Sequence, residues 1–175
     1  DVVLLDSIFY VLQSNGNIMR LSFGSQNTVA VQQYYYTQPG ESKNEFEILY
    51  YDQDKKKLIL ICKDCETDKK KSLTTFSFDP FVGAYSDSSF SVNVTDIAAS
   101  VGEKKLRFKP SAASINPKNG LLYIISAINK LLVVADINGH VKNVYKIDES
   151  VFKQPEGITF TPSGGMIVSN EAADV

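Results

Sequence analysis

The residues best suited to chemistry are oxygen-bearing side chains at the ends of two strand-like segments. Glu156 opens one segment, and the segment that would pair with it ends in Ser169, Asn170 and Glu171. A turn rich in proline and glycine separates the two segments, as a tight reversal requires. Because the start of one hairpin strand lies beside the end of its partner, we expect these oxygens to share one edge of a sheet.

Residues that could act as a nucleophile, a redox pair or a general base are few. Cys62 and Cys65 form a Cys-x-x-Cys motif with no helix signal after it, so a local disulfide or two free thiols is favoured over a redox pair or a zinc site. His140 is the only histidine and lies in an Asn-Gly-His turn. The chain contains neither a Gly-x-Ser-x-Gly motif nor a phosphate-binding glycine loop. The sequence therefore gives catalysis little support, and it leaves open acid–base chemistry by two carboxylates.

The elements that would position these residues recur along the chain. The clearest copy has a strand at 111–115, a turn at 116–120, very apolar strands at 121–126 and 130–136, and a fourth strand at 141–147. Four short antiparallel strands in about 40 residues are typical of one blade of a β-propeller. We interpret the chain as a single all-β propeller domain, 1–175, with blade-like repeats at roughly 1–37, 45–92, 110–148 and 154–175.

Two features interrupt or limit this pattern. Residues 95–101 begin with a candidate N-cap and continue with helix formers, which predicts a short inserted helix near 95–102. The first and last repeats are incomplete. We therefore expect a partial ring of about three and a half four-stranded blades, with a complete four-bladed ring as the alternative.

The propeller hypothesis gathers the candidate residues at one place. Glu47 and Ser111 hold the same opening position in their repeats as Glu156, and the first strand of a blade is innermost, so these side chains should surround the channel mouth. Clustered oxygens suit Ca²⁺, which takes about six to eight oxygen ligands, or a small polar ligand. The alternative is that each carboxylate accepts hydrogen bonds from loop N–H groups and joins blade to blade. The candidate calcium ligands are Glu47, Glu156 and Glu171, and the candidate ligand-binding residues are Glu47, Ser111, Glu156, Ser169 and Asn170.

Composition limits the partners. The chain has 175 residues, is 43% hydrophobic and carries a formal net charge of −2, which suggests no nucleic-acid partner. Apolar runs such as 58–61 are too short to span a bilayer, so no direct membrane insertion is expected of this segment. The lysine runs at 55–57 and 69–71 are interpreted as solvated turns. An unknown small ligand or a protein partner is compatible with this composition and charge.

Several segments resemble the SdiA-regulated-like bacterial propellers, a family related to NHL-type and esterase-like phytase propellers. The resemblance is strongest from Lys109 to Glu171, and a Glu-Phe-Glu-Ile-Leu start at residues 45–49 resembles an earlier blade of that family. Three places depart from the family pattern: Ile48 replaces a glycine, Ser126-Ala127 lacks the usual acidic residue, and Asn170 replaces a glutamate. The matching segments are 110–117, 121–126, 131–139, 154–158 and 167–169.

The resemblance implies a periplasmic or cell-surface protein, often a lipoprotein, with calcium as a cofactor in some members. The favoured function is a non-catalytic binding module that takes calcium or a small polar ligand at the channel mouth. One alternative is a metal-dependent propeller hydrolase acting on a phosphate ester or a lactone. The other is a purely structural interaction platform.

Overall fold

The computed structural model describes residues 1–25, 28–37, 44–68, 71–86 and 89–171. The chain forms two compact units. Unit 1 consists of Asp1–Thr67 and Thr75–Ser89, and unit 2 consists of Asp68–Thr74 and Phe90–Val175. Within the described ranges, none of the helical structure has the length and apolar character needed to cross a bilayer.

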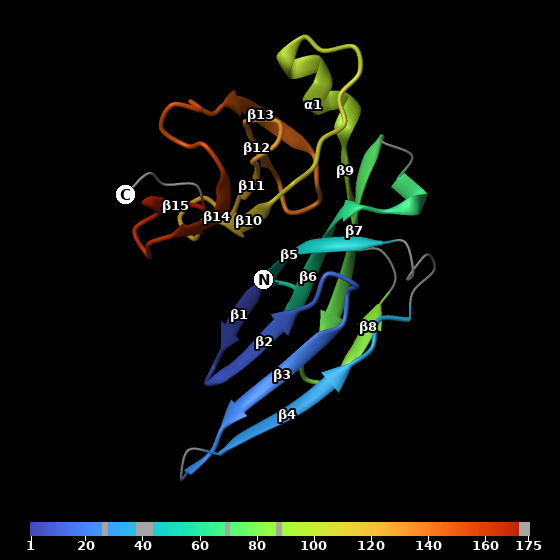
Figure 1. The fold of residues 1–175 in the computed structure, drawn as a ribbon, viewed down its shortest axis with the longest axis vertical. Coiled ribbons are helices and arrows are strands. Elements are labelled where there is room, and N and C mark those ends of the chain that lie inside the picture. The colour runs from blue at the N-terminus through green and yellow to red at the C-terminus, as the bar shows by residue number, and fades with distance from the viewer. Residues whose placement is uncertain (26–27, 38–43, 69–70, 87–88, 172–175) are drawn as a thin grey trace. The chain divides into compact units, whose positions relative to one another are not determined.

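The first sheet of unit 1 is an antiparallel meander (Figure 1). Its strands, in order across the sheet, are β1 (Val2–Leu5), β2 (Ile8–Leu12), β3 (Ile18–Phe23) and β4 (Val29–Tyr34). The turn between β2 and β3 contains Gly16 at φ +88°, a left-handed conformation that a residue without Cβ adopts at little cost. The short apolar strands and their turn residues thus explain this sheet locally.

The second sheet of unit 1 contains the longest strands of the chain. Its order is β5 (Glu45–Asp52), β6 (Lys57–Asp64), β7 (Ser72–Asp79) and β8 (Ala84–Ser86). Residues 75–79 of β7 pair with β6 and β8 in unit 1, whereas residues 72–74 pair with β9 (Ser91–Asn93) in unit 2. The continuous apolar run 58–61 in β6 is fully buried, as expected of a strand covered on both faces.

An aromatic cluster, formed by Tyr36, Phe46, Phe76 and Tyr85, lies in the core of unit 1. The ring of Tyr36 lies 5.1 Å from that of Phe46, 5.4 Å from that of Phe76 and 5.5 Å from that of Tyr85, all edge to face. Such pairs add stabilisation beyond the apolar area that they bury. The aromatic cluster therefore joins the end of the first sheet to the second sheet within this unit.

A disulfide links Cys62 to Cys65 at the end of β6. Both sulfurs belong to buried residues, and a single 3-10 turn, η2 (Glu66–Asp68), follows them. Of the two forms expected for this pair, a local disulfide or free thiols, the structure has the disulfide.

Unit 2 contains a short helix, as the sequence predicted. Helix α1 (Val94–Val101) starts one residue before the predicted range, because Asn93 rather than Thr95 is its N-cap. The Asn93 side chain accepts a hydrogen bond from the Thr95 N–H at 2.8 Å. Gly102 ends the helix in a left-handed conformation.

Two further antiparallel sheets complete unit 2 (Figure 1). The first contains β10 (Ala112–Ile115), β11 (Leu122–Ser126), β12 (Leu131–Ala135) and β13 (Val141–Lys146), and the second is the hairpin of β14 (Pro155–Phe160) and β15 (Met166–Asn170). Ala112, Ile125 and Ile158 form the buried cluster between these strands.

Candidate functional site

Two of the predicted site residues, Glu47 and Glu156, stand at equivalent places in their hairpins. In β5 the pairing passes from Phe46 to Ile48 and leaves Glu47 without a partner across the ladder. In β14 the pairing passes from Pro155 to Gly157, so Glu156 is the residue added at the equivalent place of this ladder. Each glutamate is therefore the extra residue of a β-bulge, a device that redirects a side chain and is common near functional sites.

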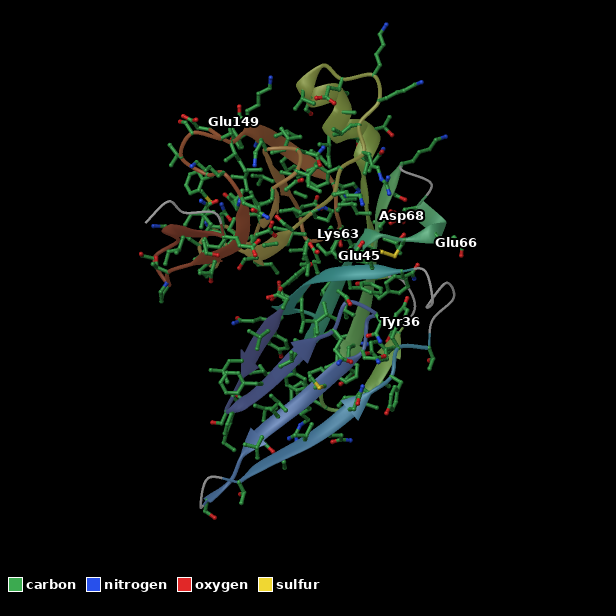
Figure 2. The ribbon with its side chains drawn as sticks, viewed as in Figure 1. Tyr36, Glu45, Lys63, Glu66, Asp68 and Glu149 are labelled. Atoms are coloured by element: carbon green, nitrogen blue, oxygen red, sulfur yellow. A yellow bond between two sulfur atoms is a disulfide. The ribbon has the colours of Figure 1, made fainter. Side chains whose placement is uncertain are left out.

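Glu47, in unit 1, is ion-paired with Lys63 of the neighbouring strand β6. The Lys63 ammonium also lies 3.5 Å from a carboxylate oxygen of Glu45, and Figure 2 shows Lys63 beside Glu45. Burial lowers the pKa of Lys63, but the hydrogen bond and charge of Glu47, followed by those of Glu45, outweigh it and raise the pKa above its ordinary value. The Lys63 ammonium thus neutralises the Glu47 carboxylate. A calcium ion bound at Glu47 would have to compete with Lys63.

We expect Lys63→Met to remove part of the alkaline pH dependence of stability. A lysine whose pKa is raised by folding stabilises the folded state below its unfolded pKa, and this contribution disappears as the pH rises through the folded pKa. The variant should lose about 1 kcal/mol of unfolding free energy at pH 7 and show a smaller further loss above about pH 10. Denaturant unfolding across this pH range measures both quantities.

Other groups in unit 1 also lose protons at alkaline pH. Comparing the stability–pH profiles of the variant and the unaltered chain therefore isolates the contribution of Lys63. Burial raises the pKa of Tyr50 and Tyr85 in both proteins, so their contribution cancels in the difference. Equal pH profiles for the two proteins would contradict the assignment of Lys63.

Ser111, in unit 2, joins the two sheets of that unit. Its hydroxyl donates to the Pro155 carbonyl at 2.8 Å and accepts from the Ala127 N–H at 3.2 Å. Its own N–H donates to the carbonyl of Ile125, the residue that pairs with Ala112 at the start of β10. With an exposed fraction of only 9%, Ser111 acts as a buried bridge between β10 and β14.

The remaining predicted residues gather at one end of the β14–β15 hairpin. Pro155 pairs with Asn170, whose side-chain oxygen accepts from the Gln154 N–H at 2.6 Å. Ser169 and Glu171 are exposed, and Glu156 and Asn170 are partly buried. Unit 2 therefore brings together Ser111, Glu156, Ser169, Asn170 and Glu171, while Glu47 belongs to unit 1.

His140 lies apart from this group within unit 2, on the turn between β12 and β13. Its ring Nδ1 lies 3.0 Å from a carboxylate oxygen of Asp136, and the Lys142 ammonium lies 3.2 Å from the same oxygen. Burial raises the pKa of Asp136, but hydrogen bonds from His140, Lys142 and the Asn138 N–H outweigh it and place the pKa well below its ordinary value. The histidine is exposed and fixes a turn.

Sequence reasoning missed Lys63 and the two bulges. An alternating strand pattern gives no sign of a bulge until the cross-strand partners are known. The only available signal was the break in alternation at Glu47, which is followed by three buried residues in succession.

Comparison with known proteins is informative only at the level of structure. No protein-family model matches the chain, and no curated protein matches it in sequence. Among solved structures, a candidate 6-phosphogluconolactonase from Bacteroides uniformis superposes with a TM-score of 0.60 at 13% identity, over 98% of this chain and 49% of that one. A second, from Bacteroides fragilis, gives 0.57 at 13% identity with the same coverage of both chains.

A third solved structure is an exo-β-1,3-galactanase from Phanerochaete chrysosporium, with a TM-score of 0.58 at 12% identity, over 98% of this chain and 43% of that one. The chain spans about half the length of the solved structures that resemble it. The fold is that of a β-propeller. Its antiparallel four-stranded sheets are blades, which confirms the fold class predicted from the sequence.

Proposed function

We propose that the chain provides blades to a non-catalytic, extracytoplasmic binding propeller of the SdiA-regulated-like kind, and that the end of the β14–β15 hairpin in unit 2 binds a calcium ion. The observation that carries this proposal is the bulge at Glu156. It places Glu156, a partly buried residue, at the end of β14 that pairs with Asn170, the last residue of β15, and Glu171 follows directly. All side-chain ligands there are oxygens, the atoms that Ca²⁺ prefers.

Two further observations support the proposal. The Cys62–Cys65 disulfide is typical of a protein that matures in an oxidising compartment, such as the periplasm or the cell surface. His140, the only histidine of the chain, is bound to Asp136 on an exposed turn, which favours binding over histidine-dependent catalysis.

Calcium titration of the whole chain tests this function. We expect Ca²⁺ to raise the melting temperature of the unaltered chain and of Glu149→Gln, and to have little effect on Glu156→Gln. Glu149 is the matched control because it is an exposed carboxylate of the same unit, on the segment before β14 (Figure 2). No shift in any of the three proteins would exclude calcium at this edge.

A lactone hydrolase is the second candidate, and the two Bacteroides structures described as candidate 6-phosphogluconolactonases favour it. At 13% identity they support it only through the fold. A pH-stat assay on a δ-lactone separates the two functions. Turnover above the buffer rate that disappears in Glu156→Gln but not in Glu149→Gln would favour the hydrolase.

A further inference from the structure

Unit 2 contains an open cavity of about 480 Å³ beside helix α1. One wall is the helix itself, another is the segment 104–107 that follows it, and Lys71 closes the edge near the start of β7. This volume lies within the range of natural small-molecule sites, about 300–1,000 Å³. The cavity is separate from the hairpin end discussed above, since none of the predicted site residues lines it.

The lining of the cavity is strongly basic. Lys71, Lys104, Lys105 and Arg107 contribute four positive charges, and no acidic side chain of the described residues lines the cavity. This contrasts with the chain as a whole, in which 20 acidic residues outnumber 18 lysines and arginines. Concentrated positive charge in a concave site attracts a multivalent anion.

The rest of the lining is apolar except for Thr95, and it is held by local hydrogen bonds. Val94 and Ala98 of α1 are buried, and Leu106 is partly buried. The Val94 N–H donates to the Lys71 carbonyl at 2.9 Å, and the Asn129 side chain donates to the Arg107 carbonyl at 3.2 Å. The two basic edges are therefore positioned against an apolar floor, and the first turn of the helix is capped by Asn93.

We propose that this cavity binds a small organic phosphate, with the phosphate between Lys71 on one side and Lys104, Lys105 and Arg107 on the other. A tetrahedral dianion accepts hydrogen bonds from several directions, which matches cations placed on two separate segments, and the arginine can bind two of its oxygens at once. The apolar floor takes the carbon body of the ligand, so the site suits a small molecule better than a polymer. This inference does not depend on the calcium site.

Calorimetric titration of the whole chain with glucose 6-phosphate, inorganic phosphate, glucose and citrate tests the proposal. Both phosphates should bind saturably, glucose should not, and citrate should bind more weakly than glucose 6-phosphate. The Lys104→Gln/Lys105→Gln double variant should weaken binding of glucose 6-phosphate by about tenfold or more, because two charge-assisted contacts are lost. Raising the salt from about 50 to 500 mM should also weaken binding in the unaltered chain.

The control is Lys118→Gln/Lys146→Gln, which removes the same charge from exposed positions of unit 2 outside the cavity. It should leave the affinity within about twofold, since isolated surface charges contribute little. The melting temperature of each variant shows whether it is folded. The proposal is overturned if glucose 6-phosphate does not bind, if the control loses as much affinity as the cavity variant, or if citrate binds and the phosphates do not.

Discussion

Phe46→Ala is expected to lower the free energy of unfolding by about 3–5 kcal/mol, the usual cost of removing a fully buried phenylalanine. Phe46 has an exposed fraction of 1%, and its ring lies 5.1 Å from that of Tyr36 and 5.7 Å from that of Phe76. It also packs on Gly16, where a Cβ would lie 2.9 Å from the ring. The substitution therefore opens a cavity at the centre of the aromatic cluster. Denaturant unfolding followed by tyrosine fluorescence measures the loss.

Phe81→Ala is the matched control, because Phe81 belongs to the same unit and is 68% exposed. Its effect should stay within about 0.5 kcal/mol. Similar losses for the two variants would show that the aromatic cluster does not hold unit 1 together.

Gly139→Ala is expected to destabilise unit 2 by about 3 kcal/mol, through backbone strain and steric overlap together. Gly139 adopts φ +87° in the turn between β12 and β13, a conformation that L residues disfavour. A Cβ there would overlap the Ser91 carbonyl oxygen and lie 2.8 Å from the ring of Phe90. The backbone of β9 cannot move away easily, because Ser91 is paired with Thr74. Thermal unfolding and amide exchange in unit 2 measure the effect.

Gly120→Ala separates backbone strain from steric overlap. Gly120 has a similar φ of +68°, but nothing lies within 4 Å of the position that its Cβ would take. This variant should therefore show the conformational cost alone, about 1–2 kcal/mol. Equal losses at Gly139 and Gly120 would mean that the contact with β9 contributes nothing.

The repeated strands could be predicted because their signal is local. Each strand is a short apolar run bounded by asparagine, proline or glycine, and antiparallel neighbours need only a tight turn. The helix was predicted for the same reason, and its start was displaced by one residue because both Asn93 and Thr95 can cap. The order of strands within each sheet follows directly from such turns.

The candidate sites were harder to predict because they depend on cross-strand neighbours. Glu47 has the expected opening position, but its partner Lys63 lies 16 residues further along the chain. The lysine run at 69–71 was interpreted as a solvated turn; residues 69 and 70 lie outside the described residues, and Lys71 is an exposed turn residue that also lines a cavity together with Lys104 and Lys105. A net charge of −2 for the whole chain conceals this local positive surface, because it averages over both units.

The bulge at Glu47 has a consequence for insertions and deletions in this chain. Side chains alternate between the two faces of a strand, so one extra residue changes which face every earlier residue occupies. The bulge absorbs this change in the native chain, because Phe46 pairs with Cys62 and Ile48 with Ile61 although Glu47 lies between them. Deleting Glu47, rather than replacing it, would therefore restore regular alternation and leave Phe46 opposite Cys62, on the face of the aromatic cluster. A relative that lacks this one residue could therefore keep phenylalanine at position 46, whereas a gap placed elsewhere in an alignment would assign core residues to the wrong face.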